Sequence, residues 1–132
     1  MHPRKLPGFA IGVEFMVKFQ NDRGYISLAP EVFTTLVGYA ATNCFGVKGM
    51  AMRSMTDGLV HLLKRESMGK GVYITYGEGP CVCIDLHIIV DQGVNIPVIC
   101  DSIISEVRYK VSQATGVEVR SVNVFIDSIN LD

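Results

Sequence analysis

The sequence predicts an α/β fold of the two-layer α+β type, with a single mixed β-sheet of four to five strands and two long amphipathic helices packed on one face. Residues 81–90, CVCIDLHIIV, alternate two kinds of side chain with the two-residue period of a strand. Residues 32–45 and 96–114 instead place apolar side chains at three- and four-residue intervals, the pattern of an amphipathic helix. One sheet covered by both helices is the simplest way to bury these apolar stripes.

Four further strands are expected beside the central one. Residues 23–28, 47–53 and 72–76 are β-rich segments bounded by glycine or polar turns. The last of the three is joined to the central strand by the sequence GEGP, which predicts a β-hairpin. Residues 117–126 are predicted as the final strand, and their apolar phase changes part-way along, so a bulge or bend is expected near Arg120.

The two long helices have recognisable ends. Pro30 suits the first position of the first helix, and Gly46 is placed to terminate it. Asn95 is expected to cap the second helix, and Gly116 is expected to end it.

The middle segment is less regular. Asp57 is expected to cap a short helix that carries the apolar side chains of residues 59–63. Met50, Met52 and Met55 precede it, and core packing is the ordinary explanation for methionines. The alternative is an adaptable surface for a partner or a second copy of the chain, because thioether side chains repack readily.

The length and composition are those of one packed domain. The chain has 132 residues, of which 48% are hydrophobic and 19% charged, a balance that argues against disorder. Twelve basic and 13 acidic residues give a net charge of −1, so the overall charge does not attract nucleic acid or anionic lipid. A short basic cluster, Lys64, Arg65 and Lys70, is typical of a solvated surface.

Cysteine usage and hydropathy predict a cytoplasmic protein. The four cysteines form no CxxC pair and lack the density of a secreted disulfide scaffold. No run approaches the roughly 18 apolar residues that a membrane-spanning helix requires, so no direct membrane insertion is expected.

The first fifteen residues are expected to be an N-terminal extension. Glu14 interrupts their apolar stretch, and no small-residue cleavage site follows, unlike in a signal peptide. Met16 opens a plausible N-terminus. We therefore expect residues 1–15 to lie upstream of the natural start or to be an expression remnant, and residues 16–132 to form a single domain.

One row of side chains on the central strand suggests chemistry: Cys81, Cys83, Asp85 and His87. Successive members of this row lie about 6.6–7 Å apart. Ligand atoms of a tetrahedral zinc ion lie only about 2.0–2.3 Å from the metal. The four side chains therefore cannot converge on one ion, and only neighbours could share one if another segment supplied the remaining ligands. The sequence also lacks a GxSxG elbow, a Walker motif and a GxGxxG motif. We expect no metal, no cofactor and no catalytic residue. An enzyme that uses Asp85 and His87 is the last-ranked alternative, and it would need both at the bottom of a cleft.

Five segments, in this order, carry a family resemblance: GYISLAPEVFTTLVGYAA at 24–41, FGVKGM at 45–50, GKGVYITY at 69–76, VCIDLHIIVDQGVNIP at 82–97 and TGVEVRSVNVFIDSI at 115–129. With these segments the chain resembles the alkaline shock protein family of bacterial envelope stress response proteins, which are common in Gram-positive bacteria. The match spans almost everything from Gly24 onward. The family does not require the extension formed by residues 1–15.

The resemblance implies a cytoplasmic protein that is linked to cell-envelope stress and has no established enzymatic activity. Some relatives self-assemble and associate with the membrane through a small integral-membrane partner. We therefore expect a homo-oligomer, with a small membrane-anchor protein as a partner. The expected function is that of a non-enzymatic interaction or scaffold protein. The alternative is a small nucleic-acid-binding α/β domain, against which stand the near-neutral charge and the lack of a GxxG clamp or an aromatic RNP signature.

Overall fold

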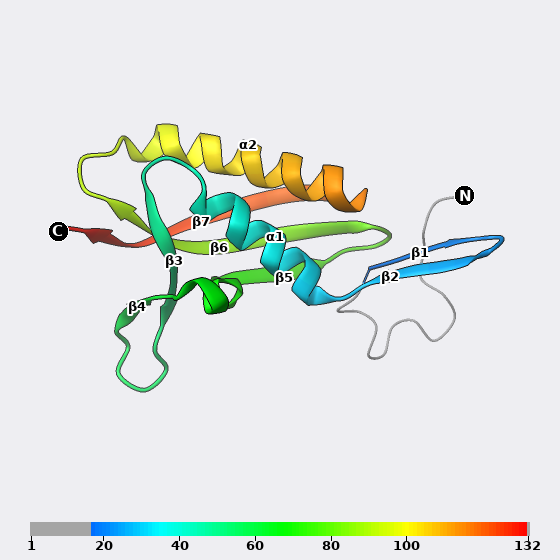
Figure 1. Ribbon diagram of the computed structural model, residues 1–132, viewed down its shortest axis with the longest axis horizontal. Coiled ribbons are helices and arrows are strands. Elements are labelled where there is room, and N and C mark those ends of the chain that lie inside the picture. The colour runs from blue at the N-terminus through cyan, green and yellow to red at the C-terminus, as the bar shows by residue number, and fades with distance from the viewer. Residues whose placement is uncertain (1–16, 132) are drawn as a thin grey trace.

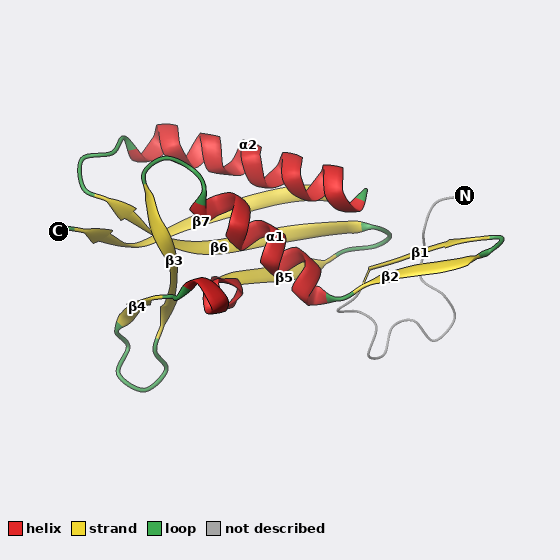
Figure 2. Cartoon of the chain, in the orientation of Figure 1, coloured by secondary structure: helices red, strands yellow, loops and turns green. Residues whose placement is uncertain are grey.

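The computed structural model describes residues 17–131, so the predicted extension of residues 1–15 lies outside the described part of the chain. Figures 1 and 2 show the arrangement of the elements. In chain order they are β1 (Val17–Asn21), β2 (Gly24–Leu28), α1 (Pro30–Thr42), β3 (Val47–Arg53), β4 (Val60–Leu62), the 3₁₀-helix η1 (Arg65–Gly71), β5 (Val72–Tyr76), β6 (Cys81–Asp91), α2 (Ile96–Thr115) and β7 (Glu118–Asn130).

Strand β6 is the centre of a mixed five-stranded sheet. Along one edge, β7 runs parallel to β6 over the whole length of β6, beginning with Cys81 opposite Glu118. Two antiparallel strands share the other edge, because β5 pairs with residues 82–86 of β6 and β3 with residues 88–90. Strand β4 extends the sheet beyond β3. The mixed sheet predicted from the sequence is thus confirmed, and so is the β5–β6 hairpin.

The core lies between one face of this sheet and the helices. Five alternate side chains of β6 are fully buried: Val82, Ile84, Leu86, Ile88 and Val90. Phe33 of α1 and Ile103 of α2 are equally buried in the same cluster. Both helices lie on the same side of β6 (Figure 2). Because a fully buried aliphatic or aromatic side chain contributes about 1.5–3 kcal/mol, this face is the main source of stability.

Helix α2 begins and ends where the sequence predicts. The Asn95 side chain accepts a hydrogen bond from the Val98 backbone N–H at 3.2 Å, which caps the first turn. Gly116 follows the last turn with a φ of +75°, a left-handed conformation that glycine adopts without strain.

Helix α1 is shorter than predicted, since it ends at Thr42 and has 13 residues against 20 in α2. The Thr42 hydroxyl donates to the Gly38 carbonyl at 2.8 Å and competes with continuation of the helix. Phe45, which the periodicity placed in the buried stripe, is 86% exposed. Only α2 is therefore the long helix that was expected.

The prediction of a short helix at residues 59–63 is wrong. This segment contains β4, which pairs antiparallel with β3. Asp57 accepts a hydrogen bond from the Leu59 N–H at 2.9 Å inside the β3–β4 turn and caps no helix. Leu59 and Leu62 are 59% and 47% exposed. The apolar side chains whose spacing suggested a helix therefore do not pack into the core. The edge of β3 supplies backbone partners instead, and this tertiary contact overrides local preference.

The prediction that residues 23–28 form a strand is confirmed, but their placement in the main sheet is wrong. They form β2, which pairs with β1 in a separate two-stranded sheet that projects from the main body (Figure 1). The end of the chain also differs from the prediction. Strand β7 continues to Asn130, with the expected bulge at Arg120 and a second one at Asp127.

Gly71 provides a test of the junction between β3 and β5. A Cβ atom at Gly71 would lie 2.8 Å from the Ala51 carbonyl oxygen and 3.3 Å from that of His87. Because these are strand backbone atoms that cannot move independently, we predict that Gly71→Ala lowers the free energy of unfolding by about 2–3 kcal/mol. The control is Gly69→Ala, whose Cβ would meet the Thr34 side chain at 3.2 Å and should cost less than about 1 kcal/mol. If denaturant unfolding shows that Gly71→Ala and Gly69→Ala lower the free energy of unfolding equally, the prediction is contradicted.

Candidate interaction surface on the open sheet face

The face of β5, β6 and β7 that points away from the helices is called the open face. Its members alternate with the buried side chains of the same strands, and the strand register sets them side by side. They are Tyr73 and Thr75 of β5, Cys83, Asp85 and His87 of β6, and Ser121, Asn123, Phe125 and Asp127 of β7.

His87 is enclosed by three neighbours on the open face. Its Nδ1 atom lies 3.1 Å and 3.0 Å from the two carboxylate oxygens of Asp127. Its ring stacks on Phe125, with centroids 4.7 Å apart and planes at 13°, and meets Tyr73 edge-on at 5.4 Å. Because an ionised carboxylate only accepts hydrogen bonds, Nδ1 carries the hydrogen and donates it to Asp127. The imidazole is therefore held in one orientation, with Nδ1 directed at the carboxylate.

Asp85 has a different partner from His87. The Asn123 side-chain amide donates a hydrogen bond to Asp85 Oδ1 at 2.8 Å, across the β6–β7 ladder. The two residues singled out from the sequence thus each pair with their own side chain on β7, and the structure does not join them into an acid/base pair. Tyr73 and Phe125 beside them are 52% and 44% exposed, so this is an open surface. The condition for an enzyme using Asp85 and His87, a shared cleft, is not met.

The cysteine thiols make local contacts. Cys81 Sγ donates to the Glu78 carbonyl at 3.0 Å, and Cys44 Sγ donates to the Ala40 carbonyl at 3.3 Å. Burial raises the pKa of the Cys44 thiol, with a smaller effect from the Glu106 charge, and burial also raises the pKa of Cys100. These two thiols therefore stay protonated at neutral pH. Within residues 17–131, no three His, Cys, Asp or Glu side chains are grouped so that they could hold a metal ion.

The structure separates the three methionines. Met50 is fully buried in the core, so the prediction of a contact surface is wrong for this residue. Met52 is partly buried, and Met55 in the β3–β4 turn is completely exposed. A contact surface for a partner or a second copy could therefore include only Met52 and Met55. For these two methionines it stays a prediction.

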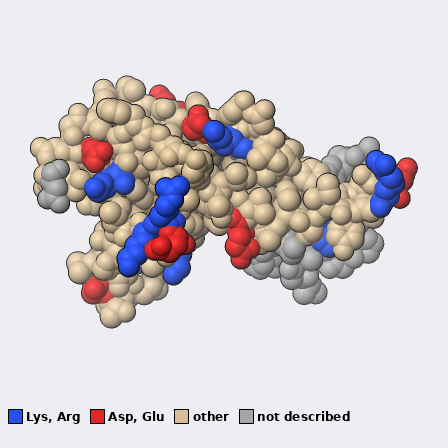
Figure 3. Space-filling view, in the orientation of Figure 1, with Lys and Arg blue, Asp and Glu red and all other residues tan. Residues whose placement is uncertain are grey.

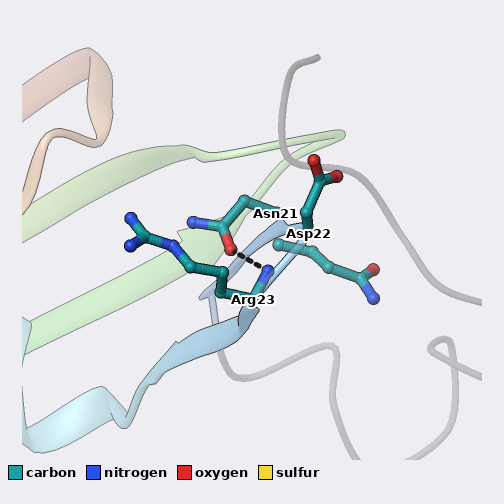
Figure 4. Close-up of a pocket in the computed structure, with 4 residues that line it drawn as sticks. Asn21, Asp22 and Arg23 are labelled. Carbon is teal, nitrogen blue, oxygen red and sulfur yellow. Dashed lines mark hydrogen bonds between the residues drawn. The ribbon is translucent and has the colours of Figure 1, made fainter.

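Two hollows of the described surface lie away from the open face. One of about 540 Å³ lies at the β1–β2 turn and is lined by residues 20–23 (Figure 4). There the Asn21 side chain accepts the Arg23 backbone N–H at 2.8 Å, while the side chains of Asp22 and Arg23 point in different directions. Of the described residues, only those of this turn line the hollow, and their polar groups do not converge on one point.

The second hollow, of about 260 Å³, lies at the C-terminal end of α1 beside Lys48 and Arg65. Arg65 there lies over the Tyr39 ring of α1, with its guanidinium carbon 5.9 Å from the ring centroid. Basic and acidic side chains are interspersed on the face shown in Figure 3. The basic cluster noted in the sequence also contains an acidic residue, since Glu66 lies in η1 with Arg65 and Lys70.

Comparison with known proteins identifies the family. Residues 18–131 match the alkaline shock protein 23 family, which is described as having a cell envelope-related function. The chain belongs to this family. It is 32% identical over 116 residues to the uncharacterized protein YloU of Bacillus subtilis, covering 87% of this chain and 96% of that one. It is 31% identical over 116 residues to the uncharacterized protein Spy1614 of Streptococcus pyogenes, covering 87% and 95%. The resemblance to alkaline shock proteins is thereby confirmed.

The fold also has a distant likeness among solved structures. The protein titled MamM CTD H264E is 18% identical and gives a TM-score of 0.45, with 74% of this chain and 93% of that chain covered. This likeness is too low to bear on function.

The contact between His87 and Asp127 can be measured by a double-mutant cycle. We predict that His87→Gln and Asp127→Asn are coupled by about 1–2 kcal/mol in unfolding experiments, because a hydrogen bond to a charged group is formed where the side chains are only 28% and 15% exposed. The matched cycle combines Asp85→Asn with Asn123→Ala. Because this contact is more exposed, the coupling energy between the two substitutions should be about 0.5 kcal/mol. Additive effects in the first cycle would show that the pair does not stabilise the sheet.

Proposed function

We propose that this protein is a non-enzymatic interaction or scaffold protein of the bacterial cell-envelope stress response. The family description supports the link to the envelope. The open face supports binding, because half-exposed aromatic side chains sit among polar groups that already have partners. Burying Tyr73 and Phe125 against a partner would gain apolar contact without leaving Asp85 or Asp127 unpaired. This combination is the observation on which the proposal rests.

The proposal includes two partners, a second copy of the chain and a small membrane-anchor protein, with the protein itself in the cytoplasm. None of the described helices is long and apolar enough to span a membrane. Attachment to the membrane would therefore depend on the anchor protein. Met52 and Met55 form a second proposed contact surface, on the β3–β4 hairpin.

A nucleic-acid-binding domain is the second candidate. Sheet aromatics such as Tyr73 and Phe125 are used by some RNA-binding domains to stack bases, which favours it. Asp85 and Asp127 lie on the same face and would repel phosphates, which makes it the weaker candidate.

The open face is tested by membrane fractionation of cells that make the protein at its native level. We predict that the protein sediments with the membranes and that Tyr73→Ser moves most of it to the soluble fraction, since this change removes an exposed aromatic anchor. Tyr25→Ser is the control. Tyr25 is 60% exposed, close to the 52% of Tyr73, but it lies on the β1–β2 hairpin. Purified protein should not bind protein-free anionic vesicles. A protein found only in the soluble fraction would contradict the proposal, and salt-sensitive binding of single-stranded RNA would favour the second candidate.

The methionine surface has its own test. We predict that Met52→Ser together with Met55→Ser weakens partner capture or self-association, because thioether contacts are lost, while the unfolding midpoint changes little. Met68→Ser is a control, since Met68 packs against the core and its loss should lower stability instead. Unchanged association of the double variant, measured by light scattering and pull-down, would remove this surface from the proposal.

A further inference from the structure

Strand β7 has a long edge without a strand partner in the part of the chain that the structure describes. It contains 13 residues and pairs with β6 alone, so its outer edge presents backbone N–H and C=O groups. Such an edge readily accepts another strand, and proteins usually protect it with charges, proline, bulges or a covering side chain.

The beginning of β7 has such protection. Arg108 of α2 donates hydrogen bonds to the Val119 carbonyl at 2.6 Å and to the Arg120 carbonyl at 3.3 Å. The bulge at Arg120 adds a local bend. A second bulge at Asp127 bends the strand near its other end.

Between the two bulges the strand is regular and unprotected. Residues 121–126, SVNVFI, contain no charged residue and no proline, and four of the six are β-branched or aromatic. Each of them continues the parallel register with β6 without interruption. This is the composition of a strand that pairs with another strand.

We infer that a second copy of this chain pairs with β7 through residues 121–126, antiparallel and about a two-fold axis, so that the two sheets become one. This inference rests on the self-association in the proposed function and assigns a surface to it.

Charge complementarity favours the antiparallel arrangement. With the axis at the middle of this stretch, beside residues 123 and 124, Arg120 of each copy lies close to Asp127 of the other, which gives two opposite-charge neighbours. Within its own chain Arg120 lies 3.9 Å from Glu118, at an exposed position that leaves the guanidinium accessible to a second carboxylate. A parallel arrangement in register would instead set Arg120 beside Arg120 and Asp127 beside Asp127. Asp127 keeps its contact with His87, because a carboxylate has about four acceptor positions.

The length of its outer edge also favours β7 as the pairing strand. The other edge strands of the main sheet are shorter, since β5 has five residues and β4 has three. Pairing of β5 with β7 of the next copy would be head-to-tail and would produce an open ribbon, whereas β7 with β7 closes after two copies. The longer edge and the closed arrangement both favour β7.

The first experiment measures self-association by light scattering and sedimentation. Arg120→Glu replaces both opposite-charge contacts by like-charge contacts and should weaken dimerisation at least about tenfold. The matched control is Lys110→Glu on α2, which has the same change of charge at a side chain that is 48% exposed. It should leave the dimer unchanged.

A second experiment locates the contact and does not depend on the behaviour of Arg120→Glu. Asn123→Cys, made together with Cys83→Ser, should give a disulfide-linked dimer on mild oxidation, because residue 123 lies close to the proposed axis. Tyr73→Cys on β5 should give none in the same background. Both outcomes together support the pairing of β7 with β7.

Contrary results would be distinguishable. If the parent protein self-associates but Arg120→Glu and Lys110→Glu behave alike and Asn123→Cys gives no cross-link, the assigned surface is wrong and the scaffold proposal stands. If the parent protein is strictly monomeric, this inference fails, and the Tyr73→Ser fractionation decides the scaffold proposal separately.

Discussion

Apolar and polar side chains alternate along β6, and this alternation positions the other strands of the main sheet and both helices. Five consecutive inward positions are fully buried, and the intervening positions include Asp85 and His87. A shift of one residue in register would exchange these two sets and place ionisable groups in the core. The hydrophobic face therefore fixes the register of β6 against β3, β5 and β7, and the position of every open-face residue follows from that register.

Both edges of β6 are occupied, and this has consequences for the neighbouring strands. Because β3 and β5 share one edge, the chain must pass closely between them, which accounts for the glycine at position 71. The other edge is filled by β7, which needs a crossover because it runs parallel to β6. Helix α2 provides this crossover and also covers the core. Strand β7 is therefore an edge strand of the sheet, and its outer edge has no strand partner among the described residues.

The open face combines polar pairs with exposed aromatic rings. His87 is paired with Asp127 and Asp85 with Asn123, each across the β6–β7 ladder, and the Phe125 and Tyr73 rings contact His87. The two hollows described above lie elsewhere, at the β1–β2 turn and at the end of α1. Membership of the alkaline shock protein family agrees with a role at the cell envelope. An open sheet face, an exposed β3–β4 turn and the outer edge of β7 together offer several sites at which other chains can attach.

Elements with local signals could be predicted from the order of residues. The α2 boundaries followed from Asn95 and Gly116, and the bulge at Arg120 followed from a change of phase within one strand. Residues 59–63 could not be assigned in this way, because their short apolar run suits a helix or an edge strand until pairing with β3 selects the strand. The same is true of His87, whose partner lies 40 residues away and is brought near by the register of a parallel pair. Local patterns specify which face of an element is apolar, whereas contacts across strands depend on register, and register is set by the whole packed sheet.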